Sequence, residues 1–147
     1  MTEVLCTGTF NLLHSGHVQL LEFASKFGKL TVGVNSDSYL KKKYNNTQVI
    51  PLVHRVYMLK SLRFVDDVVV FLEDDPRNLI YQLRPAYFVR GPDYAGADLI
   101  EQEALDSVGA QLIIHHADKI YNASELVKKA PKGIFTFDSS SSFLESY

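Results

Sequence analysis

Residues 7–17 read TGTFNLLHSGH and lie between an apolar run, residues 4–6, and an amphipathic segment, residues 18–27. This order predicts a strand, a tight loop and a helix. Gly8 lets the backbone come close to a ligand, because glycine has no side chain in the way. The loop amides and the helix N-terminus offer N–H groups and positive partial charge, so we expect a phosphate as the ligand.

Two histidines stand at the start of the predicted helix. His14 and His17 are three residues apart with Gly16 between them, so both imidazoles can face an anion held by the loop amides. A glycine turn or a single histidine at a helix start is by itself mostly structural. The combination is more specific, because loop, histidine pair and helix onset coincide where an α/β sheet forms its ligand crevice.

This string resembles the H-x-G-H signature of the cytidylyltransferase-like nucleotidyltransferases. The resemblance implies that His14 and His17 bind nucleotide phosphates and stabilise the transition state at the α-phosphorus. It also implies nucleotide contacts from the rest of the loop, namely Thr9, Phe10, Asn11 and Gly16. Asn11 departs from the family, in which aspartate is common here; the change removes a charge but keeps a side chain suited to turns.

The rest of the chain alternates short apolar runs with amphipathic segments, which predicts an α/β protein with a Rossmann-like, doubly wound, parallel five-stranded sheet in a single domain. Residues 73–76, Glu-Asp-Asp-Pro, are expected to cap a helix. The expected strands are residues 4–6, 30–34, 68–71, 87–89 and 111–115, and the expected helices are residues 18–27, 38–40, 51–63, 78–83, 98–108 and 118–127.

Length and composition limit the possible functions. A chain of 147 residues with 46% hydrophobic residues suits one compact domain, which we place at residues 1–130, followed by an extended or disordered tail at 131–147. A net charge of −2 gives no argument for nucleic acid or membrane binding. The single Cys6 excludes an internal disulfide and is expected to be a buried thiol. With no signal segment or membrane span evident, we expect a cytoplasmic protein.

Three consecutive lysines, Lys41, Lys42 and Lys43, are expected in a polar loop that follows the second βα unit. One interpretation is a solubilising surface run. The other is a flap that brings lysine to the phosphates of a bound triphosphate. The resemblance favours the flap, with Lys42 in a catalytic role and Lys41 and Lys43 in nucleotide binding.

Two further segments are assigned by resemblance. Arg55 resembles the arginine of the family's [E/H]-R pair, which contacts nucleotide phosphates, so it is expected to be catalytic. Residues 90–96 read RGPDYAG and resemble a loop that meets the base and ribose. Nucleotide contacts are therefore expected from Arg90, Gly91, Asp93 and Tyr94.

The start of the last expected helix carries Asn122 and Ser124, where relatives have a Ser-Thr-Thr-like cap for the β- and γ-phosphates. Both residues are expected to bind nucleotide. His115 and His116 do not predict a zinc site, because adjacent strand residues point to opposite faces. We expect Mg²⁺ to arrive with the nucleotide, without direct side-chain ligation.

Three functions stay open. Within the family, residues 34–37, 73–76 and 90–94 look most similar to the adenylyltransferase domain that makes ADP-activated heptose, which implies AMP transfer from ATP to a phosphorylated sugar. The alternatives are a glycerol-3-phosphate cytidylyltransferase using CTP, and a catalytically weak nucleotide-binding regulatory protein. The expected partners are an NTP, a small phosphorylated sugar or polyol, and a second copy in a homodimer.

Overall fold

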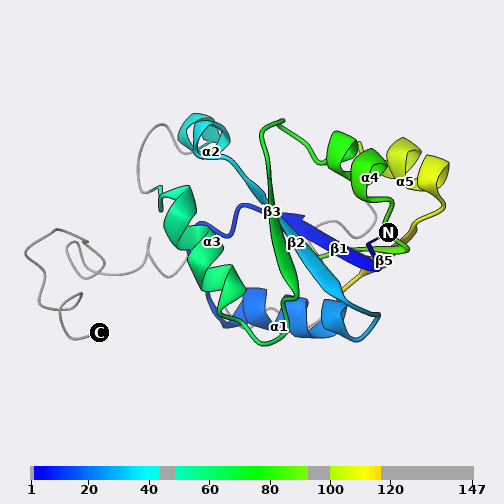
Figure 1. Ribbon diagram of the computed structural model, residues 1–147, viewed down its shortest axis with the longest axis horizontal. Coiled ribbons are helices and arrows are strands. Elements are labelled where there is room, and N and C mark those ends of the chain that lie inside the picture. The colour runs from blue at the N-terminus through cyan, green and yellow to red at the C-terminus, as the bar shows by residue number, and fades with distance from the viewer. Residues whose placement is uncertain (1, 44–48, 93–99, 117–147) are drawn as a thin grey trace, which may run out of the picture.

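A computed structural model describes residues 2–43, 49–92 and 100–116 of the chain. Strands and helices alternate along these segments (Figure 1). The strands are β1 (Val4–Gly8), β2 (Leu30–Asn35), β3 (Asp67–Phe71), β4 (Tyr87–Arg90) and β5 (Gln111–Ile114), and the helices are α1 (Ser15–Ser25), α2 (Asp37–Lys43), α3 (Leu52–Lys60), α4 (Arg77–Leu83) and α5 (Gln102–Val108).

The described strands form one sheet in the order β3-β2-β1-β4-β5, and every neighbouring pair is parallel. Strand order moves outward from β1 to β3 and then resumes on the other side of β1 with β4. Figure 1 shows α1 and α3 on one side of the sheet and α4 and α5 together on the other. The predicted doubly wound α/β fold is therefore confirmed.

Each face of the sheet has its own core, because successive strand residues point to opposite sides. Val4 and Cys6 pack with Leu21 of α1 and Leu59 of α3. Leu5 lies in a second cluster, whose other buried members are Phe71, Leu79, Ile80, Phe88, Ala104 and Leu105. With both faces covered, the strands need apolar residues at nearly every position, and this explains their continuous apolar runs.

The thiol of Cys6 is fully buried within this core, as predicted. Burial raises its pKa to about 12, against a smaller lowering by the charge of Arg90. A thiol with so high a pKa stays protonated and unreactive near neutrality.

The three lysines were predicted to lie in a loop, and this prediction is wrong. Lys41, Lys42 and Lys43 form the last turn of α2. The helix is anchored by buried Leu40 and begins beside Ser36, whose Oγ accepts a hydrogen bond from the amide of Tyr39 at 3.4 Å. Cations in a last turn stabilise a helix by interacting with its C-terminal carbonyls, so the same residues that suggested a loop extend the helix.

Other boundaries differ less. The N-cap position of α4 is Pro76, and the side chain of Asp75, one residue earlier, accepts a hydrogen bond from the first helical amide, that of Arg77, at 3.0 Å. α5 begins at Gln102 and ends at Val108, and the capping residue Gly109 that follows adopts a left-handed φ of 72°, which glycine tolerates. The expected helix at 118–127 and the tail at 131–147 lie outside the described residues. No helix in the described segments has the length and apolar character to cross a bilayer.

Candidate functional site

The carboxyl ends of β1 and β4 lie side by side at the centre of the sheet. The chain leaves β1 toward α1 on one face, and it leaves β4 toward α5 on the other. Sheets of this kind bind ligands outside the carboxyl ends of such strands, where the connections diverge. The histidine loop, residues 9–14, starts at this point.

Phe10 turns the loop. Its backbone has a left-handed φ of 46°, and its side chain is buried in the α1 and α3 core. A Cβ at Gly8 would lie 3.1 Å from the Phe10 ring, so glycine lets the loop fold back closely. The Phe10 ring also meets the His17 ring edge-on, with centroids 5.4 Å apart. Phe10 therefore supports His17 through its buried side chain.

His14 and His17 cap the first turn of α1 reciprocally. The amide of Gly16 donates to Nδ1 of His14 at 3.1 Å, and the amide of His14 donates to Nδ1 of His17 at 3.2 Å. Each Nδ1 is thus an acceptor, so each neutral ring carries its proton on Nε2. The ring centroids are only 4.0 Å apart. The structure therefore brings the predicted histidine pair together as two oriented Nε2–H donors.

Both rings resist protonation. Burial lowers the pKa of His14 below its ordinary value. Burial, together with the nearby charge of His14, lowers the pKa of His17 to about 4. The pair is therefore neutral near pH 7, so it offers hydrogen bonds rather than imidazolium charge, and the predicted binding of an anion stays a prediction.

Asn11 keeps a structural role despite its departure from the family. Its Oδ1 accepts a hydrogen bond from the amide of Ile50 at 2.8 Å, and this bond joins the histidine loop to the segment before α3. An aspartate oxygen would accept the same bond, so the exchange of Asp for Asn preserves this contact.

Arg55 lies beneath the loop and has a side-chain exposure of 1%. Its Nη1 donates to the carbonyls of Thr9 and Asn35, and its Nη2 is 2.7 Å from a carboxylate oxygen of Asp37. A direct contact with nucleotide phosphates stays a prediction. The sequence interpretation missed Asp37 as its partner, although an aspartate two residues after a strand at this edge was a usable signal.

Arg90 ends β4 and is also buried. Its Nη2 is 2.6 Å from Oε1 of Glu101, and its Nη1 donates to the carbonyl of Thr7 at 3.4 Å. Glu101 was missed as well, because it falls among helical residues with no pattern to mark it as buried.

The remaining predicted residues divide into two groups. Lys41, Lys42 and Lys43 are exposed on α2, which follows β2 at the same edge of the sheet, and Gly91 follows β4. The other group lies outside the described residues: Asp93, Tyr94, Asn122 and Ser124.

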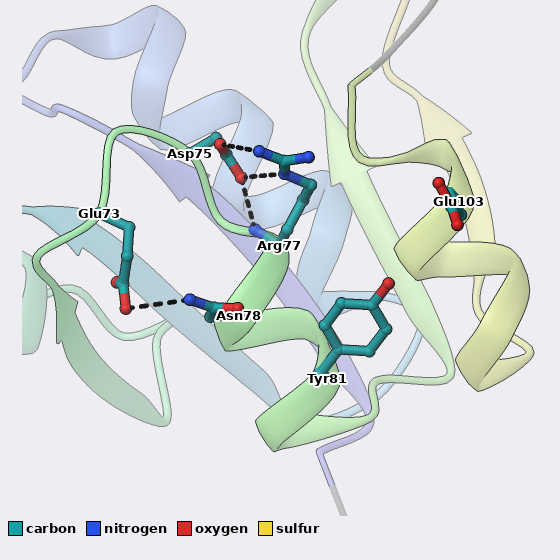
Figure 2. Close-up of a pocket in the computed structure, with 6 residues that line it drawn as sticks. All are labelled: Glu73, Asp75, Arg77, Asn78, Tyr81 and Glu103. Atoms are coloured by element: carbon teal, nitrogen blue, oxygen red, sulfur yellow. Dashed lines mark hydrogen bonds and ion pairs between the residues drawn. The ribbon is translucent and has the colours of Figure 1, made fainter.

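A hollow of about 280 Å³ lies apart from the predicted residues, between α4 and α5 (Figure 2). In it, Arg77 is paired with Asp75, and Nδ2 of the Asn78 side chain donates to Oε1 of Glu73 at 3.4 Å. Tyr81 and Glu103 complete the lining. Four of the six lining side chains are thus hydrogen-bonded to one another.

Residues 5–142 match the model of the family described as cytidylyltransferase-like. The chain therefore belongs to this family, and its class is that of the nucleotidyltransferases. The resemblance inferred from residues 7–17 is confirmed.

Among curated relatives, the chain is 46% identical over 115 residues to the bifunctional protein HldE of Streptomyces coelicolor, covering 77% of this chain and 25% of that protein. It is 41% identical over 111 residues to HldE of Geobacter sulfurreducens, covering 74% and 23%. The chain thus spans about a quarter of the length of these relatives.

Among solved structures, a lipopolysaccharide core biosynthesis protein from Thermoplasma volcanium has a TM-score of 0.64 and 25% identity, covering 78% of this chain and 93% of that one. A protein of unknown function from Archaeoglobus fulgidus has a TM-score of 0.63 and 22% identity, covering 82% and 94%, and this match supports the fold alone.

Proposed function

We propose that the protein transfers AMP from ATP to a small phosphorylated sugar, of the heptose 1-phosphate kind, and releases pyrophosphate. The observation that carries the proposal is the reciprocal cap of His14 and His17, which holds two neutral N–H donors at the ligand-binding edge of the sheet. The HldE relatives support a sugar phosphate as the acceptor class. The heptose assignment rests on the resemblance of the sequence to the adenylyltransferase domain that makes ADP-activated heptose.

The reaction needs no general base. A phosphate monoester is largely dianionic near neutrality, so one of its oxygens can attack the α-phosphorus directly. A bond forms between that oxygen and the α-phosphorus, while the bond from the α-phosphorus to the bridging oxygen of the β-phosphate breaks. Pyrophosphate leaves with the electron pair. The protein must align these groups and stabilise the negative charge.

His14 and His17 are suited to the charge that develops on the transferring phosphoryl group, because fixed neutral donors need no reorganisation during the reaction. Exposed Lys42, with Lys41 and Lys43 beside it, supplies positive charge for the triphosphate tail. These N–H and ammonium groups bind phosphate oxygens and do not ligate metals. Mg²⁺ would accordingly be held by the triphosphate itself, where it neutralises charge on the phosphate oxygens.

The proposal includes a homodimer in the cytoplasm. The dimer has physical support at the outer side of α3, where Val53 and Tyr57 are 70% and 72% exposed. Apolar side chains gathered on an outer surface favour burial against a partner. Sedimentation of the wild type and of a Tyr57→Glu variant tests this part, and a wild-type monomer at assay concentration would refute it.

The activity is tested by measuring pyrophosphate release from ATP and CTP, each with Mg²⁺ and with heptose 1-phosphate or glycerol 3-phosphate. A competition with both nucleotides and both acceptors should give ADP-heptose. A product that is only CDP-glycerol would replace the adenine and heptose assignments with the cytidylyltransferase alternative. Nucleotide binding without pyrophosphate release in any pairing would favour the regulatory binding protein.

A further inference from the structure

Arg55 is bonded to four separate segments that surround the candidate site. Its Nε donates to the carbonyl of Ile50 at 2.8 Å, and its Nη1 donates to the carbonyls of Thr9 at 3.0 Å and Asn35 at 2.7 Å. Its Nη2 is 2.7 Å from Asp37 Oδ1. These acceptors belong to the segment before α3, the histidine loop, the end of β2 and the start of α2, respectively.

The guanidinium group is planar and its N–H groups point in fixed directions. Four acceptors bonded to one such group are therefore held at fixed positions relative to one another. Two of them matter most for the proposed reaction. Thr9 begins the histidine loop, which ends at His14 and leads into the first turn of α1 with His17, and Asp37 begins the helix that ends in the lysines.

A second bond makes the connection stiffer. Ile50 is held through its carbonyl by Arg55 and through its amide by Asn11. The histidine loop is thus tied to the start of α3 at two points, Thr9 and Asn11, that flank the turn at Phe10.

The burial of Arg55 argues against direct contact with a ligand in this conformation, since 1% of its side chain is exposed. Its carboxylate partner Asp37 is 38% exposed. Burial raises the pKa of Asp37, but the hydrogen bond from Arg55 and further contacts outweigh this and leave the pKa below its ordinary value. Asp37 is therefore ionised near neutrality, and it offsets the charge of Arg55 from the surface side.

We propose that Arg55 is a positioning residue: it sets the distance between the histidine donors and the lysine helix, acting through the Thr9 carbonyl and through Asp37. The inference rests on the proposed nucleotidyl transfer. It assigns to Arg55 a geometric role where a phosphate contact was expected, and it adds Asp37 as its partner. Misalignment of groups that act together on one phosphoryl transfer lowers the rate of the chemical step more than it lowers nucleotide affinity.

The experiment compares Arg55→Lys, which keeps the charge but loses the fork, with Asp37→Ala and Asp37→Asn. Asparagine keeps an oxygen that can accept from Nη2, whereas alanine does not. We expect Arg55→Lys and Asp37→Ala to lower kcat by about 10- to 100-fold, with Kd for ATP changed less than about 3-fold, and Asp37→Asn to keep kcat within about 3-fold. The matched control is Arg77→Lys, which alters an exposed Arg–Asp pair on α4 and should change neither value.

Two kinetic results would overturn the inference. One is a loss of ATP affinity in Arg55→Lys as large as its loss of kcat, which indicates direct phosphate contact. The other is an Asp37→Asn variant as impaired as Asp37→Ala, which indicates that charge rather than geometry matters. Should Arg55→Lys fail to fold, the Asp37 pair decides alone.

A structural readout separates this inference from the proposed function. Amide hydrogen exchange at Ile50 should accelerate in Arg55→Lys and in Asp37→Ala, but not in Asp37→Asn, because the first two loosen the segment before α3. If the wild type releases no pyrophosphate with any acceptor, the proposed function fails, and unchanged exchange at Ile50 would separately refute the positioning role.

Discussion

Two arginines are buried at the carboxyl edge of the sheet, and their surroundings differ in kind. Arg55 donates mostly to neutral backbone carbonyls, and its carboxylate partner, Asp37, is partly exposed. Arg90 is paired with Glu101, and both side chains are less than a tenth exposed. Arg55 thus joins four segments of the chain, whereas Arg90 and Glu101 form one buried ion pair.

The difference separates two uses of a buried cation. Carbonyl acceptors fix the position of a guanidinium group without burying a second charge. Arg55 can therefore hold the histidine loop in place while the N–H donors of the nearby histidines stay accessible. A fully buried ion pair gains from attraction between its charges but depends on both partners, because either one alone would be a desolvated charge. We therefore interpret the hydrogen bonds of Arg55 as organising the candidate site. The ion pair of Arg90 with Glu101 instead stabilises the fold at the end of β4.

The largest expected effect tests the Arg90 side. Glu101→Ala should lower the free energy of unfolding by about 3–5 kcal/mol, because it leaves Arg90 buried without its counter-charge. Asp37→Ala should lower it by only about 1–2 kcal/mol, since water can reach the vacated place. Urea denaturation monitored by circular dichroism measures both. Equal losses would remove the distinction between the two arginines.

The second effect concerns the histidines that Arg55 is proposed to position. His17→Ala should lower kcat by about 100-fold or more while Kd for ATP changes far less, because a fixed donor acts mainly on charge that develops in the transition state. His116→Ala, on an exposed histidine after β5, serves as the control. Parallel losses in binding and turnover would instead make His17 a ground-state anchor.

The third effect is a dependence of the protein's stability on pH that arises from His17. The pKa of His17 is lowered from 6.5 to about 4 in the folded protein, so the unfolded chain binds the proton more tightly. The contribution of His17 to stability is therefore complete above about pH 6.5 and is lost as pH falls toward about 4. Thermal unfolding across this range should show a decline that is smaller in His17→Gln. Identical slopes in the two proteins would mean that His17 is not held neutral.

The smallest effect concerns the lysine helix. Lys42→Ala should raise KM for ATP several-fold and weaken its dependence on salt, because an exposed ammonium group attracts the triphosphate through screened charge. Lys60→Ala, at the far end of α3, is a matched surface control. The same small change in both variants would return the lysines to a solubilising role. Protection of residues 41–43 from proteolysis by triphosphate, but not by nucleoside, gives an independent check.

The sequence by itself determined the fold class and the first half of the site. A sheet covered on both faces needs continuous apolar runs separated by amphipathic segments. Such a pattern in the sequence therefore indicates a parallel, doubly wound sheet. His14, Gly16 and His17 interact over a distance of three residues, and local spacing of this kind can be interpreted without knowledge of the fold. The resemblance to the family was inferred from the same residues, and the family model that matches residues 5–142 confirmed it.

Only the tertiary structure decided which distant groups meet. Arg55 reaches Thr9 across 46 positions and Asn35 across 20, and Arg90 reaches Thr7 across 83. Such contacts depend on strand order and on which face each helix covers, and no local pattern encodes them. The neutral state of His17 was likewise hidden, because it depends on burial by packed neighbours. The three lysines show that a local pattern can also mislead. Their charge suggested a loop, but they form the last turn of a helix that is anchored by buried Leu40.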